Sequence, residues 1–287
     1  MAPMSGNGHC HSFNGDGRPD ILIRTISTGE LFVYPHSGRF DGPNTFGDPV
    51  KIGENFDVEN DYVLVRTIDI DGNGRADVVA LAGRDHNPDR GVFLLYNKAG
   101  LNGMDTLTPR IAISGARPDK RWETLGIRDL TGNGVDDMFG RGMDAGNVDG
   151  FLNRGMVVEN DTYDREPVPL TTVDVADFPL AMADFTGTGR DDLLVLRSNG
   201  DMDVYEFGDQ ESEEGRWFTI ARGWDGLRSI AVTDIDMDGR PDLLTLDGTG
   251  TLHVHVHSGK FDPDRPEELF DRPQVLFTGW SDVDVVT

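Results

Sequence analysis

The chain has few of the features that mark membrane, nucleic-acid-binding and disulfide-rich proteins. Its 287 residues include a single cysteine, Cys10, so no disulfide can form within the chain. It has no run of about 18 apolar residues for a membrane-spanning helix, and its first residues lack a signal peptide's apolar stretch. Only 26 basic residues oppose 51 acidic ones, giving a formal net charge of −25 at pH 7. This charge repels phosphate groups, so we expect neither nucleic acid nor anionic membranes as partners.

Five acidic segments recur along the chain and define its organisation. They begin at residues 12, 69, 129, 184 and 234, and this spacing is typical of a propeller blade and longer than that of helical solenoid repeats. Within each period, alternating apolar residues predict four short strands separated by turns. The segments read SFNGDGRPD (12–20), DIDGNGRAD (69–77), DLTGNGVDD (129–137), DFTGTGRDD (184–192) and DIDMDGRPD (234–242).

The two ends of the chain predict how the blades close into a ring. The first acidic segment has no strand before it, and the last residues, GWSDVDVVT, resemble a strand that precedes such a segment. We therefore expect the C-terminal strand to pair with the N-terminal blade, which removes two exposed sheet edges. The predicted fold is all-β: one five-bladed β-propeller of four-stranded blades over residues 12–287, after a disordered tail at residues 1–11.

One position in the strand before each acidic segment also fits a narrow ring. Gly126, Ala181 and Ala231 stand at matching places and are small enough to face a confined channel. Arg66 takes this place in the second blade and breaks the pattern.

Each acidic segment predicts a metal site. Oxygen-bearing side chains stand at positions 1, 3, 5 and 9, glycine stands at position 6, and the carbonyl of position 7 can add another oxygen. Such oxygen-rich, flexible loops favour Ca²⁺ over Mg²⁺, whereas Zn²⁺ would want histidine or cysteine. A strand follows each loop and position 12 holds no glutamate, so the loops are not EF-hands. The predicted ligands are Asn14, Asp16, Arg18 and Asp20; Asp69, Asp71, Asn73, Arg75 and Asp77; Asp129, Thr131, Asn133, Val135 and Asp137; Asp184, Thr186, Thr188, Arg190 and Asp192; Asp234, Asp236, Asp238, Arg240 and Asp242.

The carboxylate count differs between loops and should grade their affinity. We expect up to five Ca²⁺ ions, held most tightly by the fifth and second loops, which have the most aspartates at the ligand positions. The fourth loop keeps only Asp184 and Asp192, and the first begins with Ser12, so a metal-free turn is a stronger alternative there. Extracellular modules bind Ca²⁺ at about 10⁻⁴–10⁻³ M, which predicts a secreted protein whose signal peptide has been removed.

At these loops the sequence resembles the FG-GAP/VCBS repeat family, which includes the propeller of integrin α subunits and many secreted bacterial and fungal proteins. The motif recurs five times over nearly the whole chain. The resemblance implies calcium loops at one end of the ring, with ligands bound at the opposite end or between blades. Relatives include adhesion modules, lectins and some polysaccharide lyases, so the fold alone does not decide the function.

The end opposite the acidic loops contains the candidate ligand-binding residues. Trp224 and Trp280 each follow a glycine in a shared setting, with Phe56 as a counterpart, and could stack on sugar rings or cover the core at a blade junction. Basic loop residues could hold an anionic group such as a uronic acid carboxylate, or be solvated charges. These residues are Arg84, Arg117 and Arg121.

Candidates for catalysis are sparse. We expect Tyr34, Tyr96, Tyr205 and His255 at matching positions of the third strands, where they could be packing residues or general bases. His253, His255 and His257 alternate along one strand, so they could face one side together. His86 is a further candidate in a loop.

The sequence therefore favours a monomeric, secreted, calcium-binding module that recognises a glycan or protein surface. The alternative is a polysaccharide lyase-like enzyme with its site at the channel mouth or between blades. A structural adhesion domain from a larger protein is a third reading.

Overall fold

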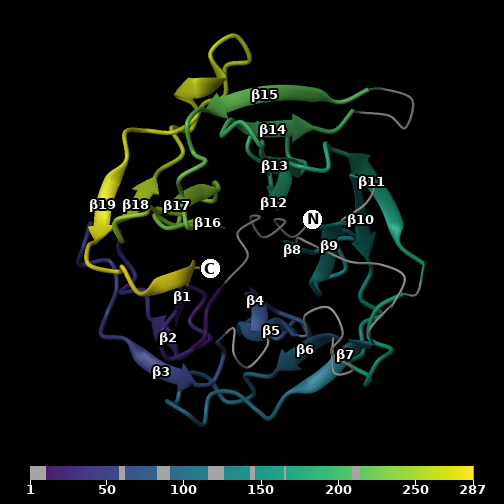
Figure 1. Cartoon of the computed structure of the whole chain (residues 1–287), viewed down its shortest axis with the longest axis vertical. Helices are drawn as coiled ribbons and strands as arrows, with labels where there is room; N and C mark the ends of the chain where they lie inside the picture. The colour runs from purple at the N-terminus through teal and green to yellow at the C-terminus, as the bar shows by residue number, and fades with distance from the viewer. Residues whose placement is uncertain are drawn as a thin grey trace, which may run out of the picture.

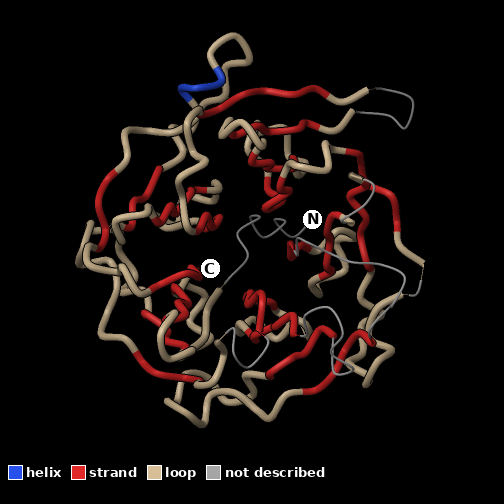
Figure 2. Tube along the Cα trace, viewed as in Figure 1, coloured by secondary structure: helices blue, strands red, loops and turns tan. Residues whose placement is uncertain are grey.

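The computed structural model describes residues 11–57, 62–82, 91–115, 126–142, 146–164, 166–208 and 214–286. Their strands form five antiparallel sheets of four strands, arranged as blades around a common centre (Figure 1). Strands and loops make up these blades, and the one helix among the described residues is a 3-10 turn at Pro266–Glu268 (Figure 2). The predicted five-bladed all-β propeller is confirmed. The described part of the chain contains no helix with the length and apolarity to cross a membrane.

Each blade runs from an inner strand at the centre of the ring to an outer strand at its rim (Figure 1). Blade 1 contains β20 (Val283–Val286), β1 (Ile21–Thr25), β2 (Leu31–Tyr34) and β3 (Val50–Gly53). Blade 2 contains β4 (Tyr62–Ile68), β5 (Asp77–Ala82), β6 (Gly91–Leu95) and β7 (Ile111–Gly115). Blade 3 contains β8 (Gly126–Arg128), β9 (Asp137–Arg141), β10 (Asn147–Phe151) and β11 (Val168–Thr172). Blade 4 contains β12 (Phe178–Ala183), β13 (Asp192–Leu196), β14 (Met202–Glu206) and β15 (Arg216–Ala221). Blade 5 contains β16 (Ser229–Thr233), β17 (Asp242–Leu246), β18 (Leu252–His255) and β19 (Gln274–Phe277).

The ring closes as the sequence predicts. The C-terminal strand β20 pairs antiparallel with β1 and is the inner strand of blade 1. A buried ion pair reinforces this closure, because Arg24 on β1 donates from Nε and Nη2 to Asp284 on β20 at 2.9 and 2.6 Å. The two ends of the chain therefore share one sheet, with β20 as its inner edge strand.

The hydrophobic core is divided among the five junctions between neighbouring blades. In β2, Leu31 and Val33 pack toward blade 2, whereas Phe32 and Tyr34 pack toward blade 5. Both faces of the sheet are thus covered, which explains why successive apolar residues on the middle strands are buried. Each fully buried large apolar side chain contributes about 1.5–3 kcal/mol, so the junctions supply most of the stability that holds the blades together.

The small inner-strand residues lie in equivalent registers. Gly126 pairs with Phe139, Ala181 with Leu194 and Ala231 with Leu244, always at the third residue of the next strand. A Cβ atom at Gly126 would lie 2.1 Å from the Phe139 ring, so that position requires glycine. Arg66 pairs with Val79 in the same register, which confirms it as the exception.

The antiparallel order also sorts the loops between the two ends of the ring. The acidic loops connect first to second strands, and they share one end with the connections between third and fourth strands. The turns between second and third strands and the connections between blades lie at the other end.

Candidate metal loops and blade junctions

The first residue of each acidic loop closes the loop on itself. In the fifth loop, Asp234 accepts hydrogen bonds from the backbone N–H groups of Asp238 and Gly239, both at 2.9 Å. Asp69, Asp129 and Asp184 accept the equivalent pair in their loops. In the first loop the Ser12 hydroxyl replaces the carboxylate, accepting from Asp16 and Gly17 at 3.0 and 3.2 Å. Serine therefore preserves the turn but brings no negative charge.

The glycine at position 6 is needed because its backbone is left-handed. Its φ is +77° in the first and second loops and +88° in the fifth, a region that residues with a Cβ rarely adopt. The recurring glycine is thus explained by loop geometry.

The ninth residue ties each loop to the strand beyond it. Asp242 accepts the Ile235 N–H at 2.9 Å and the His257 N–H at 2.8 Å, so it bridges the loop and the end of the third strand. Asp20, Asp77 and Asp137 bridge their blades in the same way. Burial, together with the charges of Asp236 and Asp234, raises the pKa of Asp242 to about 7. A nearby cation would oppose that shift by stabilising the charged carboxylate.

Two loops bring three carboxylates together. In the second loop, one carboxylate oxygen of each of Asp69, Asp71 and Asp77 lies within 4.8 Å of the other two. In the fifth loop, oxygens of Asp234, Asp236 and Asp242 lie equally close together. These are the two loops expected to bind most tightly. Three converging carboxylates with no basic residue among them form the oxygen set that hard divalent cations prefer.

The fourth loop shows a different sign of a metal site. The Thr186 hydroxyl, at position 3, is buried beside the Asp192 carboxylate, and a cation held there could take oxygens of both residues as ligands. The residues of the second, fourth and fifth loops therefore fit a divalent cation.

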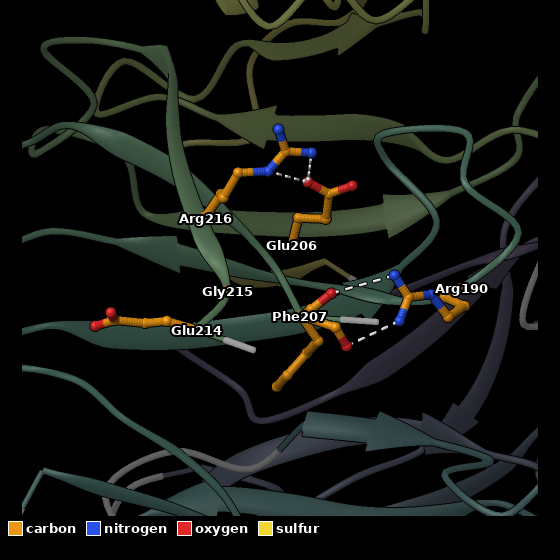
Figure 3. A pocket seen from close by; sticks show the side chains of 7 residues that line it. Arg190, Glu206, Phe207, Glu214, Gly215 and Arg216 are labelled. Carbon is orange, nitrogen blue, oxygen red and sulfur yellow. Dashed lines mark hydrogen bonds and ion pairs between the residues drawn. The ribbon is translucent and has the colours of Figure 1, made fainter. Parts of the chain in front are cut away.

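The arginine at position 7 has a role that the sequence reasoning missed. Only its carbonyl was expected to contribute, but the side chain reaches the end of the third strand of the same blade. Arg75 donates to the carbonyls of Asn97 and Lys98 at 3.2 and 3.1 Å. Arg190 likewise donates to the carbonyls of Phe207 and Gly208 (Figure 3). The recurrence of arginine at this position in four loops was the available signal, and Val135 is the exception.

Arg190 also lines a pocket of about 320 Å³ between the third and fourth strands of blade 4 (Figure 3). Across the pocket, Arg216 forms an ion pair with Glu206 at 2.6 Å. Three of the charged side chains that line the pocket, Arg190, Glu206 and Arg216, therefore already have partners in the protein.

The comparisons with known proteins bear on these loops. A family model described as the FG-GAP-like repeat matches residues 13–80 and 184–245, which contain the first, second, fourth and fifth acidic loops. Two stretches of the propeller thus match FG-GAP-like repeats, and we call the five acidic loops FG-GAP loops. The third FG-GAP loop lies outside the match, yet its Asp129 and Asp137 make the same backbone hydrogen bonds as their counterparts.

Solved structures give more distant similarities. One is an Agrocybe aegerita lectin described by its specific recognition of non-reducing terminal N-acetylglucosamine, with 20% identity, a TM-score of 0.46, and coverage of 96% of this chain and 68% of the lectin. Another is the Photorhabdus luminescens Tc holotoxin pore, with 15% identity, a TM-score of 0.42, and coverage of 97% of this chain but only 12% of that one. A search of curated proteins by sequence found no match. Similarity at this level carries no argument about ligands.

A ring of side-chain hydrogen bonds links the FG-GAP loops across blade junctions. The side chain is an imidazole or an amide and stands two residues after the third strand of its blade. It contacts the backbone carbonyl of the second residue in the FG-GAP loop of the preceding blade. Asn97 donates to the Phe13 carbonyl at 2.7 Å, and His257 contacts the Phe185 carbonyl at 3.0 Å. Asn153 and His36 repeat the contact at two further junctions. Sequence reasoning missed these residues, although the shared stretches HSGRF (36–40) and HSGKF (257–261) mark them.

The junction between blades 3 and 4 lacks this contact and uses a different one. Phe207 occupies the equivalent place and has no side-chain donor. Instead, Arg128 on β8 forms a buried ion pair with Asp191 of the fourth FG-GAP loop. Each junction thus has a polar tie beside its apolar core.

The candidate ligand-binding tryptophans occupy equivalent places and contribute to packing. The backbone N–H groups of Trp224, Trp280 and Phe56 donate to the backbone carbonyls of Gly200, Gly250 and Gly29, respectively, at 2.8–2.9 Å. This shared contact confirms that Phe56 is the counterpart of the tryptophans. Trp280 stacks on Phe277 with ring centroids 4.6 Å apart, and both tryptophans are only partly exposed. Of the two roles expected from the sequence, covering the core at a blade junction is the one that matches the position of the tryptophans. The other candidates, Arg84, His86, Arg117 and Arg121, lie outside the described residues.

The predicted alignment of the third strands is wrong by one residue in blade 2. Tyr34, Tyr205 and His255 do match, each opposite the first residue after its acidic loop. In blade 2 this place belongs to Leu95, and Tyr96 points to the other face. In blade 3 it belongs to Phe151. An extra or missing residue between short strands is invisible in composition but reverses the face that a side chain occupies.

The three alternating histidines do not converge on one site. His253 lies 3.4 Å from Asp247, and His255 lies 3.0 Å from the Thr245 hydroxyl and packs against Trp224. His257 is buried at the blade junction described above. Burial lowers the pKa of His255 to about 4 and raises that of Tyr96 to about 12. Both shifts oppose proton transfer near neutral pH.

Proposed function

We propose that the protein binds Ca²⁺ in its FG-GAP loops and acts outside cells as a recognition module. The observation that carries the calcium assignment is the convergence of three aspartates in the second and fifth loops. Carboxylate oxygens that are fixed by backbone hydrogen bonds need little rearrangement to accept a cation, so loop geometry and ligand geometry agree.

The proposed ions have a structural role. Positions 1 and 9 already hold the loop and the third strand through hydrogen bonds, and a cation between them would neutralise charges that repel in its absence. Five ions would add a charge of about +10 to the net charge of −25. Because loops of this class need millimolar Ca²⁺, we place the protein outside the cytosol, as a secreted monomer.

The recognition surface that we propose is the end opposite the FG-GAP loops. Connections between blades converge there, and loops on a rigid scaffold are where binding residues usually lie. The acidic surface favours a glycan or protein over nucleic acid. A lyase-like activity has less support, since His255 and Tyr96 have pKa values shifted away from neutral and lie in separate blades.

The test has two independent arms. Elemental analysis after dialysis against 1 mM Ca²⁺ should find calcium, and an Asp71→Asn, Asp236→Asn double variant should retain less of it. Glycan and matrix-protein arrays should then show calcium-dependent binding that EGTA removes. Calcium without any array signal would contradict the recognition role alone, whereas a calcium-free protein would contradict the proposal at its base.

A further inference from the structure

Arg66 is the one inner-strand residue that breaks the small-residue pattern of the ring. It lies on β4, the innermost strand of blade 2, in the register that Gly126, Ala181 and Ala231 occupy elsewhere (Figure 1). A long cation has therefore replaced a small side chain at a confined position. Neither the FG-GAP loops nor the blade ties use it.

The guanidinium of Arg66 has little to compensate its charge. Its Nη1 donates to the carbonyl of its own neighbour, Val65, at 2.9 Å, and within the described part of the chain no carboxylate lies within ion-pair distance of it. The charged group that acts on its pKa is another cation, Arg24.

Arg24 uses the carboxylate that this region provides. Its Nε and Nη2 bind Asp284, and its Nη1 donates to the carbonyls of Phe56 and Tyr62 at 3.1 and 3.2 Å. Asp284 thus pairs with Arg24 and not with Arg66, although the molecule as a whole is strongly acidic. Burial, with a smaller effect of Arg24, lowers the pKa of Arg66 to about 10, so its side chain is still a cation at neutral pH.

Arg66 is partly exposed at the inner wall of the ring and has no carboxylate partner within the described part of the chain, so its guanidinium is accessible to a small anion from solvent. A guanidinium presents a planar fork of donors that pairs with two oxygens of a carboxylate or phosphate. We propose that Arg66 binds the oxyanion of a small ligand, a carboxylate or phosphate group, at the inner wall of blade 2. The site depends on the inner strands, so it is independent of the calcium assignment and of the recognition surface.

Thermal melting tests this site with sodium acetate and sodium methyl phosphate as probes and sodium chloride as the reference, at equal ionic strength and fixed free Ca²⁺. We expect acetate or methyl phosphate to raise the melting temperature of the wild type by about 3–6 °C at tenfold Kd. The probe with the larger shift identifies the preferred oxyanion.

Two variants make the test specific. Arg66→Ala restores the small residue found in blades 4 and 5, so it should melt at or above the wild-type temperature in chloride and show no oxyanion response. Arg39→Ala removes an exposed arginine that pairs only with Asp41 and should respond like the wild type. Equal shifts in all three salts, an unchanged response of Arg66→Ala, or a lower melting temperature of Arg66→Ala in chloride would each overturn the proposal.

Saturation-transfer NMR of the wild-type protein gives a second readout that does not depend on a variant. Acetate or methyl phosphate should receive saturation, and the other probe should compete. Absence of transfer for both would equally refute an oxyanion site.

Discussion

The aspartate at position 9 is the residue on which each FG-GAP repeat depends most. It is fully buried in the second, third and fifth loops, and its two oxygens accept backbone N–H groups from two separate segments. Asparagine at this position would replace one accepting carboxylate oxygen with an NH₂ group, a donor that would face a backbone N–H group. Buried groups left unsatisfied in this way cost about 1–3 kcal/mol each, and more where a charge is involved.

Asp242→Asn should therefore destabilise the protein by about 2–4 kcal/mol even in EGTA, where metal binding plays no part. Urea denaturation measures this loss. Asp264→Asn, at an exposed carboxylate in the same blade, is the matched control and should change stability by no more than about 0.5 kcal/mol. Equal stability of the two variants in EGTA would show that position 9 matters only as a metal ligand.

His255 should make stability depend on pH. Burial, together with the charge of His253, lowers its pKa to about 4 from an ordinary value of 6.5. Between these values the unfolded chain binds a proton that the folded protein does not, so this contribution to stability is lost as the pH falls from about 6.5 to 4. His255→Tyr supplies the residue that blades 1 and 4 use in this register and does not titrate there.

The stability of His255→Tyr relative to the wild type should accordingly rise by about 1–3 kcal/mol between pH 7 and pH 4. Urea denaturation of both proteins at each pH measures the difference and cancels the titration of shared groups. A difference that stays constant with pH would mean that His255 titrates normally in the folded protein.

At the scale of the element, four of the five blades are each joined to the preceding FG-GAP loop by one side chain. Asn and His perform this task interchangeably, at Asn97 and Asn153 in two blades and at His36 and His257 in two others. His257→Asn should thus keep the contact to the Phe185 carbonyl, whereas His257→Ala should cost about 1–3 kcal/mol. Chemical denaturation of the pair distinguishes a specific hydrogen bond from general packing, because packing alone would make both variants equally unstable.

Element-scale features also show what the sequence could and could not predict. The acidic segments predicted the number of blades because each repeats a local pattern, and the last residues predicted the closing strand. Tyr96 was misplaced because one residue of register decides the face of a strand, and the polar ties were missed because they join residues up to 199 positions apart.

At the scale of the whole molecule, closure depends on a single strand and its ion pair. Asp284 neutralises Arg24, which is only 4% exposed, so Asp284→Asn would leave a buried guanidinium without its charge partner. Breaking such a pair costs about 3–5 kcal/mol. We expect Asp284→Asn to lower the free energy of unfolding by that amount. If β20 contributed only backbone pairing, the variant would unfold like the wild type.

The central claim is that Ca²⁺ in the FG-GAP loops stabilises the whole ring, and thermal melting in Ca²⁺ against EGTA tests it most directly. Each site occupied at tenfold Kd adds about 1.4 kcal/mol, so the melting temperature should rise steadily with Ca²⁺ through the millimolar range. Mg²⁺ at the same concentrations should have a smaller effect, because it demands stricter geometry. The same melting temperature in EGTA and in 10 mM Ca²⁺ would contradict the account.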